Sequence, residues 1–265
     1  MNEITRGQRI YFATVGLLAL WVGAWGTFAP AHADRALPWL VPPLHARFLG
    51  AVYLSAAFVL ANGLVARRQS EVRAMTLLIT LWTGGLLVLS LFHLEEFDPH
   101  HKPVWFWFGA YVVYPLAGVW SLLAHRARPP TSDDAPLPTW ARRYLLVQGA
   151  GFVVLSLLLL AIPSSMVAVW PWKISPLLAQ IYSAPFLAYG SCSWLLARGR
   201  TWPESRIVVR GAFVFAVFAL VASVLHRNLF SSERVATWVW FAVFGVAAGM
   251  SGAMQVRFLR RGLSP

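Results

Sequence analysis

Charged residues and cysteine are both scarce in this chain. Only 12% of its 265 residues are charged and 58% are apolar, whereas a soluble domain carries about a quarter charged residues. The single cysteine, Cys192, excludes an intramolecular disulfide and argues against a cysteine-based metal site. This composition is typical of a membrane protein, and the length leaves no room for a separate soluble catalytic domain.

The chain also lacks the short motifs that mark common enzyme chemistries. It has no phosphate-binding glycine loop, no H-E-x-x-H, no G-x-S-x-G and no twin-cysteine motif. Charged residues are absent from the middle of the apolar runs, which disfavours an ion-coupled transporter. We therefore expect a non-catalytic protein.

Eight apolar runs are long enough to cross a bilayer, because a span needs about 20 residues for a hydrocarbon core of roughly 30 Å. Backbone groups in lipid must be satisfied within their own segment, so these runs are predicted to be helices. The predicted spans cover residues 9–28, 47–66, 74–93, 104–125, 144–162, 177–197, 209–226 and 235–256.

The two halves of the chain align without a gap at one constant offset of 133 residues. Rare residues carry the match: Trp39 with Trp172, Trp105 with Trp238, Trp107 with Trp240, and His93 with His226. Residues that this offset pairs are here called equivalent. Because each half holds an even number of spans, the repeat is parallel and its pseudo-twofold axis runs along the membrane normal. The predicted architecture is all-α, with a first four-helix repeat at 1–128, a cytoplasmic linker at 129–141 and a second four-helix repeat at 142–265.

The net charge of +12 is unevenly placed, which indicates membrane topology rather than nucleic-acid binding. Sixteen of the 22 basic residues fall on the side of the N-terminus, and the other six are Arg35, Arg47, Lys102, Lys173, Arg227 and Arg234. The positive-inside rule then places both termini in the cytoplasm. Arginine outnumbers lysine by twenty to two, a usage that we interpret as bacterial. We expect a multi-pass protein of the bacterial inner (plasma) membrane whose main partner is the lipid bilayer.

Several of the fourteen tryptophans lie at predicted membrane boundaries, where the indole ring prefers the headgroup level. The residues interpreted as interfacial anchors are Trp39, Trp172, Trp105, Trp107, Trp238 and Trp240. For the segments 38–44 and 171–177 the alternative is a lid over a cavity entered from outside.

The end of the third predicted helix, H-L-E-E-F-D-P-H-H at 93–101, holds the densest set of metal-capable groups. The candidate metal ligands are His93, Glu96, Asp98, His100 and His101. The second half has lost nearly all of these donors, so a hydrated acidic loop is the alternative.

His93 and His226 form the one histidine pair that the repeat preserves. If the third helix of each half lines the pseudo-twofold axis, the two imidazoles are candidates to bind one haem or metal. If these helices lie at the periphery, each histidine caps its helix end.

Three functions stay open on the sequence alone. The leading one is non-catalytic binding of a hydrophobic small molecule, a lipid or a larger membrane complex. The second is a small-molecule transporter that uses two rocking halves. The third is a membrane metalloprotein or haem protein with its site at the outer ends of the third and seventh helices. The cofactor stays unknown.

Overall fold

The computed structural model describes residues 3–38, 41–125, 135–199 and 201–260, and within them the chain is helical, with no strand. The long helices of the first half are α1 (Arg6–Phe28), α2 (Pro43–Val65), α3 (Gln69–Phe92) and α4 (Lys102–Ala124). Those of the second half are α5 (Thr139–Ala161), α7 (Pro176–Arg198), α8 (Trp202–Leu225) and α9 (Val235–Leu259). Short helices join them: η1 (Pro30–Arg35), η2 (Leu94–Glu96), α6 (Pro163–Val169) and η3 (Arg227–Leu229). The all-α prediction is confirmed.

Local sequence explains where several of these helices begin. Thr5 and Gln8 form a capping box before α1, each side chain binding the other residue's backbone N–H. Both α2 and α7 start with proline, whose fixed φ suits the first helical position and whose missing N–H is not needed there. The Ser175 hydroxyl also accepts from the N–H of Leu178 and caps α7.

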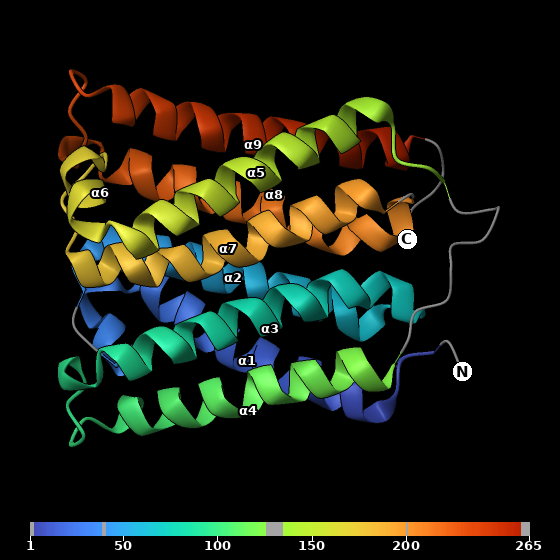
Figure 1. Ribbon diagram of the computed structural model, residues 1–265, viewed down its shortest axis with the longest axis horizontal. Helices are drawn as coiled ribbons and strands as arrows, with labels where there is room; N and C mark the ends of the chain where they lie inside the picture. The colour runs from blue at the N-terminus through green and yellow to red at the C-terminus, as the bar shows by residue number, and fades with distance from the viewer. Residues whose placement is uncertain (1–2, 39–40, 126–134, 200, 261–265) are drawn as a thin grey trace.

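The long helices run side by side in one bundle (Figure 1). The helices α2, α3, α7 and α8 are mostly buried and form its centre, whereas α1, α4, α5 and α9 bury one narrow stripe each. The two halves meet where α2 packs on α8 and α3 packs on both α7 and α8. Phe48 of α2 enters the second half, where it packs against Trp172, Tyr182 and Trp240.

Glycines let the paired helices within each half approach closely. A Cβ added at Gly26 would lie 2.6 Å from the carbonyl oxygen of Ala46, so α1 can lie this near to α2 only without a side chain there. In the second half, a Cβ at Gly149 would lie 2.9 Å from the carbonyl oxygen of Gly190. Larger residues at these positions would push α1 from α2, and α5 from α7.

Among the described residues, seven helices are long and apolar enough to cross a membrane: α1, α2, α3, α4, α5, α8 and α9. Their outer faces carry large exposed apolar side chains, such as Leu17 on α1, Leu116 on α4 and Val147 on α5. Such faces are costly in water but suit contact with lipid. The bundle is therefore compatible with a multi-pass membrane protein.

The helix α7 is the exception among the eight predicted spans. It is 23 residues long and lies in the bundle alongside α5 and α3 (Figure 1), but it is more polar than the other long helices. Its polar residues Tyr182, Ser183 and Tyr189 are buried. Because protein rather than lipid covers α7, its sequence does not need the apolarity of a lipid-facing span.

The two ends of the bundle differ in their connections (Figure 1). One end, here called the short-helix end, carries η1, η2, α6 and η3. The other, here called the arginine-rich end, is where α1 begins, α9 ends and the short turn at 66–68 lies, together with the end of α7 and the start of α8. Each long helix of the second half starts at the residue equivalent to the start of one in the first half, and the short helices do the same.

Candidate functional site: an aromatic cavity among α1 to α4

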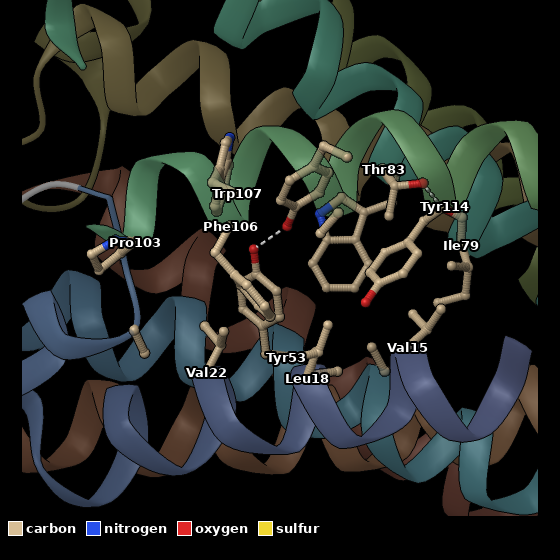
Figure 2. Close-up of a pocket in the computed structure, with 16 residues that line it drawn as sticks. Val15, Leu18, Val22, Tyr53, Ile79, Thr83, Pro103, Phe106, Trp107 and Tyr114 are labelled. Atoms are coloured by element: carbon tan, nitrogen blue, oxygen red, sulfur yellow. Dashed lines mark hydrogen bonds between the residues drawn. The ribbon is translucent and has the colours of Figure 1, made fainter. Parts of the chain in front are cut away.

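A cavity lies among the four long helices of the first half (Figure 2). It encloses about 570 Å³, part of which is open to the surroundings. Helix α1 contributes an apolar wall that includes Ala19, and α2 contributes Tyr53 and Ala56. The remaining wall is largely aromatic and comes from α3 and α4: Trp82, Thr83, Phe106, Trp107, Tyr111 and Tyr114.

Few polar atoms reach this cavity, and most of them already have partners. The hydroxyls of Tyr53 and Tyr111 are hydrogen-bonded to each other across the wall (Figure 2). Thr83 donates to the carbonyl oxygen of Ile79 at 2.7 Å within α3. In the described part of the chain, the Tyr114 hydroxyl and the Trp82 indole N–H have no hydrogen-bond partner. Both are donors that a ligand could use.

The second half fills the corresponding positions with larger or more apolar side chains. Phe152 is the equivalent of Ala19, and Tyr189 is the equivalent of Ala56. Phe152 packs on Phe186 with ring centroids 5.3 Å apart, and Tyr189 stacks on Phe215 at 5.5 Å. The second half also has fewer hydroxyl groups at these positions. Phe186, Phe244 and Ala247 are the equivalents of Tyr53, Tyr111 and Tyr114. The first half thus has both space and hydroxyl groups at these positions.

These features define what the cavity can bind. Its wall offers aromatic faces and donors without an opposing formal charge, so burying a charged ligand would be unfavourable. A neutral molecule with one carbonyl or ether oxygen could accept from Tyr114 or Trp82 while its apolar body contacts the rings. The exposed Phe106 lines the cavity, so its opening reaches the outer surface of the bundle.

The structure gives His93 and His226 separate partners at the short-helix end. His93 Nε2 lies 2.7 Å from Oε1 of Gln180 on α7, and His226 Nε2 is hydrogen-bonded to the Arg47 guanidinium of α2. Burial and the Arg47 charge lower the pKa of His226, so its neutral ring can accept from Arg47. Helices α3 and α8 do pack on each other, but each histidine uses Nε2 in a contact between the halves. Ligation of a haem or metal by this pair stays a prediction.

The five candidate metal ligands of the acidic loop are not brought together. Glu96, Asp98 and His100 are exposed, His101 lies 3.1 Å from the Asp34 carbonyl oxygen, and His93 contacts Gln180. Within the described residues, no group of three or more His, Cys, Asp or Glu side chains is placed to hold a metal ion. The geometry therefore gives no support to a centre at this loop.

The tryptophans interpreted as interfacial anchors fall into two groups. Trp105 and Trp238 are 69% and 63% exposed, as an anchor requires. For Trp107, Trp172 and Trp240 the interpretation needs correction, because these rings are buried within the bundle. Burial is tolerated because the Trp107 and Trp240 indoles donate to serine hydroxyls and their rings fill the core. Trp39 lies outside the described residues.

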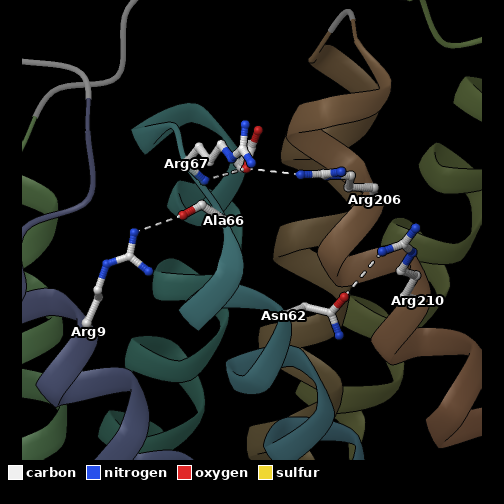
Figure 3. A network of polar contacts seen from close by, with 7 residues as sticks. Arg9, Asn62, Ala66, Arg67, Arg206 and Arg210 are labelled. Carbon is white, nitrogen blue, oxygen red and sulfur yellow. Dashed lines mark hydrogen bonds and ion pairs between the residues drawn. The ribbon is translucent and has the colours of Figure 1, made fainter. Parts of the chain in front are cut away.

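A polar network holds the halves together at the arginine-rich end (Figure 3). Arg206 of α8 forms an ion pair with Glu71 of α3 at 3.1 Å, and Glu71 also accepts from the backbone N–H of Arg67. Close by, Arg210 donates to the side-chain oxygen of Asn62 at 3.2 Å. These contacts pair the buried Glu71 carboxylate with Arg206 and link α8 to α2 and α3, which is a structural role.

Comparison of the chain with protein-family models, with curated proteins and with solved structures found no match. Function must therefore be argued from the cavity and its surroundings.

Sequence reasoning missed the cavity, although a signal for it was present. In the alignment of the two halves, Ala19 is paired with Phe152 and Ala56 with Tyr189. Small residues opposite large aromatic ones, at positions that belong to the core of both halves, indicate space in one half that the other has filled. The alignment alone does not show that Tyr53, Trp82 and Tyr114 border that space.

Proposed function

We propose that this chain is a non-catalytic integral membrane protein that binds a neutral, largely apolar small molecule in the cavity among α1 to α4. The single observation that carries the proposal is the contrast between this cavity and the packed aromatic positions of the second half. A core void is costly in stability, and a void lined by unpartnered donors is costlier still. A bound ligand would offset both costs.

Binding of a fluorescent ketone tests this proposal. Prodan, a neutral naphthyl ketone, has an apolar body and one acceptor oxygen. Prodan is titrated into the full chain in an uncharged detergent. Tryptophan emission should fall to a plateau as the probe binds, because Trp82 and Trp107 line the site and transfer their excitation energy to bound prodan. Linear quenching without saturation, the same as in empty-micelle controls with free tryptophan, would contradict the proposal.

We also propose that the bundle is a tandem parallel repeat with eight spans, α7 being the span that protein covers. Matching contacts at equivalent positions support the repeat. The Trp107 indole donates to Ser90 and the Trp240 indole to Ser223, each at 2.9 Å. An isolated bridge pairs Glu3 with Arg68, and another pairs the equivalent residues of the second half. The interface between the halves is closely packed, so a transporter with a central site gains no support.

The repeat predicts equal effects of two serine substitutions. Ser90→Ala and Ser223→Ala should each destabilise the protein by about 1–2 kcal/mol, because each leaves a buried indole N–H without its acceptor. Thermal unfolding of the full chain in detergent measures both, and the exposed Ser164→Ala serves as a control. A large effect at only one of the two positions would argue against equivalent environments.

For orientation, we propose that both termini are cytoplasmic and that the short-helix end faces outside, as the placement of arginine favours. In a Cys192→Ala background, a membrane-impermeant maleimide added to intact cells should label Glu95→Cys and Ser232→Cys. It should label Thr139→Cys only after permeabilisation, since Thr139 lies at the arginine-rich end. Labelling of E95C without S232C would mean that α7 does not cross.

A further inference from the structure

A second hollow lies at the short-helix end of the second half, away from the aromatic cavity. It is bordered by α6, the segment 170–175, η3 and the turn before α9, and it encloses about 790 Å³, partly open to solvent. Its polar lining comes from Lys173, Ser231 and Arg234, and its apolar lining includes Val167 and Leu229. Two cations and a hydroxyl therefore border one apolar recess.

The backbone around these groups is fixed by hydrogen bonds. His45 Nε2 donates to the Lys173 carbonyl oxygen at 3.1 Å, and the ring is buried between the halves. One guanidinium nitrogen of Arg234 donates to the Trp170 carbonyl oxygen at 3.2 Å. The same segment is thus held at both of its ends, which positions Lys173 and Arg234 on the hollow.

The donors on the hollow retain capacity for a ligand. In the described part of the chain, the Lys173 ammonium has no partner, and Arg234 uses one of its five N–H groups for Trp170. The Ser231 hydroxyl accepts from the backbone N–H of Glu233 at 3.3 Å, which leaves its own proton to donate.

Acidic groups do not neutralise this recess. The nearest in sequence is Glu233, which is exposed and, within the described residues, forms no ion pair with Lys173 or Arg234. In the first half, the positions equivalent to Lys173, Ser231 and Arg234 hold Leu40, Asp98 and His101. The cationic character therefore belongs to the second half alone, and the repeat does not require it.

We propose that this hollow binds a phosphate-type oxyanion, either as the headgroup of an anionic lipid or as free phosphate. Ammonium and guanidinium groups make short, charge-assisted hydrogen bonds to phosphate oxygens, and Arg234 can do so in a bidentate manner. The apolar lining, which includes Val167 and Leu229, offers contacts for the first carbons of a lipid chain whose headgroup is bound there. The ligand is distinct from the neutral molecule of the aromatic cavity.

Calorimetric titration of the full chain in an uncharged detergent tests the proposal with two probes, dihexanoyl phosphatidylglycerol and inorganic phosphate. Saturable binding of the lipid, weakened roughly tenfold or more in Lys173→Gln/Arg234→Gln, is expected if a headgroup occupies the site. If inorganic phosphate also binds, and its affinity falls by the same factor in the double variant, then the free ion is sufficient to occupy the site. Either result supports the oxyanion site and says which source it takes.

Lys102→Gln is the matched control, because Lys102 is the other lysine of the chain and lies at the same end, outside the hollow. Its affinity should stay within about twofold of wild type. An equal loss in K102Q, or no binding of either probe to wild type, overturns the site. Lys173→Gln alone keeps the test valid if the double variant unfolds, because the Lys173 ammonium has no partner among the described residues.

Discussion

Ala56→Tyr is expected to abolish saturable prodan binding, with a loss of affinity of roughly tenfold or more. Ala56 is 2% exposed and lies on the cavity wall, so a tyrosine ring there has to occupy the cavity. The substitution copies Tyr189, which stacks on Phe215 in the second half. Ala19→Phe, which copies Phe152, should have the same effect.

The control for cavity filling is Ala13→Phe. Ala13 also lies on α1, but it borders an outer groove with Gly16 and Leu17 instead of the cavity. Prodan binding should therefore be unchanged in A13F. Overpacking can cost about 1–3 kcal/mol, so the melting temperature of each variant is measured first. A folded A56Y protein that binds prodan as wild type does would rule out the cavity as the binding site.

Glu71→Gln is expected to lower the free energy of unfolding by about 3 kcal/mol, because it leaves the Arg206 guanidinium without its countercharge. The Glu71 side chain is 8% exposed and that of Arg206 is 16% exposed, so water replaces the lost partner poorly. The pair also joins α3 to α8, and its loss weakens the interface between the halves. Denaturant unfolding in mixed micelles measures the change.

Two further variants test whether the loss of stability comes from leaving a buried charge without its partner. Glu95→Gln makes the same chemical change on a side chain that is 72% exposed and should alter stability by no more than about 0.5 kcal/mol. Replacing both partners, as Glu71→Met with Arg206→Leu, should recover most of the loss, because no buried charge is left alone. A Glu71→Gln protein as stable as wild type would show that solvent already screens the pair.

The sequence predicted the helices well because a bilayer imposes length and apolarity on each segment separately. Most of the long helices start earlier than predicted, since residues such as Pro43 and Pro176 begin helices before the apolar run does. Helix α7 is less apolar than the other long helices, because burial by its neighbours relaxes the apolarity that marks a lipid-facing span. The burial of Trp107 and Trp240 depends on serines that lie 17 residues earlier in the chain, and that contact is not visible in hydropathy.

The cavity was harder to predict than the helices, because it depends on contacts between helices and not on the apolarity of any one segment. The histidines and acidic residues at 93–101 predicted a metal site because imidazole and carboxylate groups are strong metal ligands. In the described part of the structure, these side chains do not come together in a group that could hold a metal ion. The cavity depends on the absence of side-chain volume at Ala19 and Ala56, and alanine carries no chemical signal of its own. Only the pairing of helices reveals that Trp82 and Tyr114 border the same space.

The polar, protein-covered character of α7 constrains how the chain can be assembled. A translocon sorts segments by apolarity as they emerge. In the proposed eight-span topology, entry of the polar α7 therefore depends on earlier helices that cover Tyr182, Ser183 and Tyr189, and α2, α3 and α5 supply these contacts. A nascent chain that failed at this step would deliver α8 and α9 upside down. Arg206 would then lie across the membrane from Glu71. In the proposed topology, synthesis of the first half before the second therefore favours the correct orientation of α8 and α9.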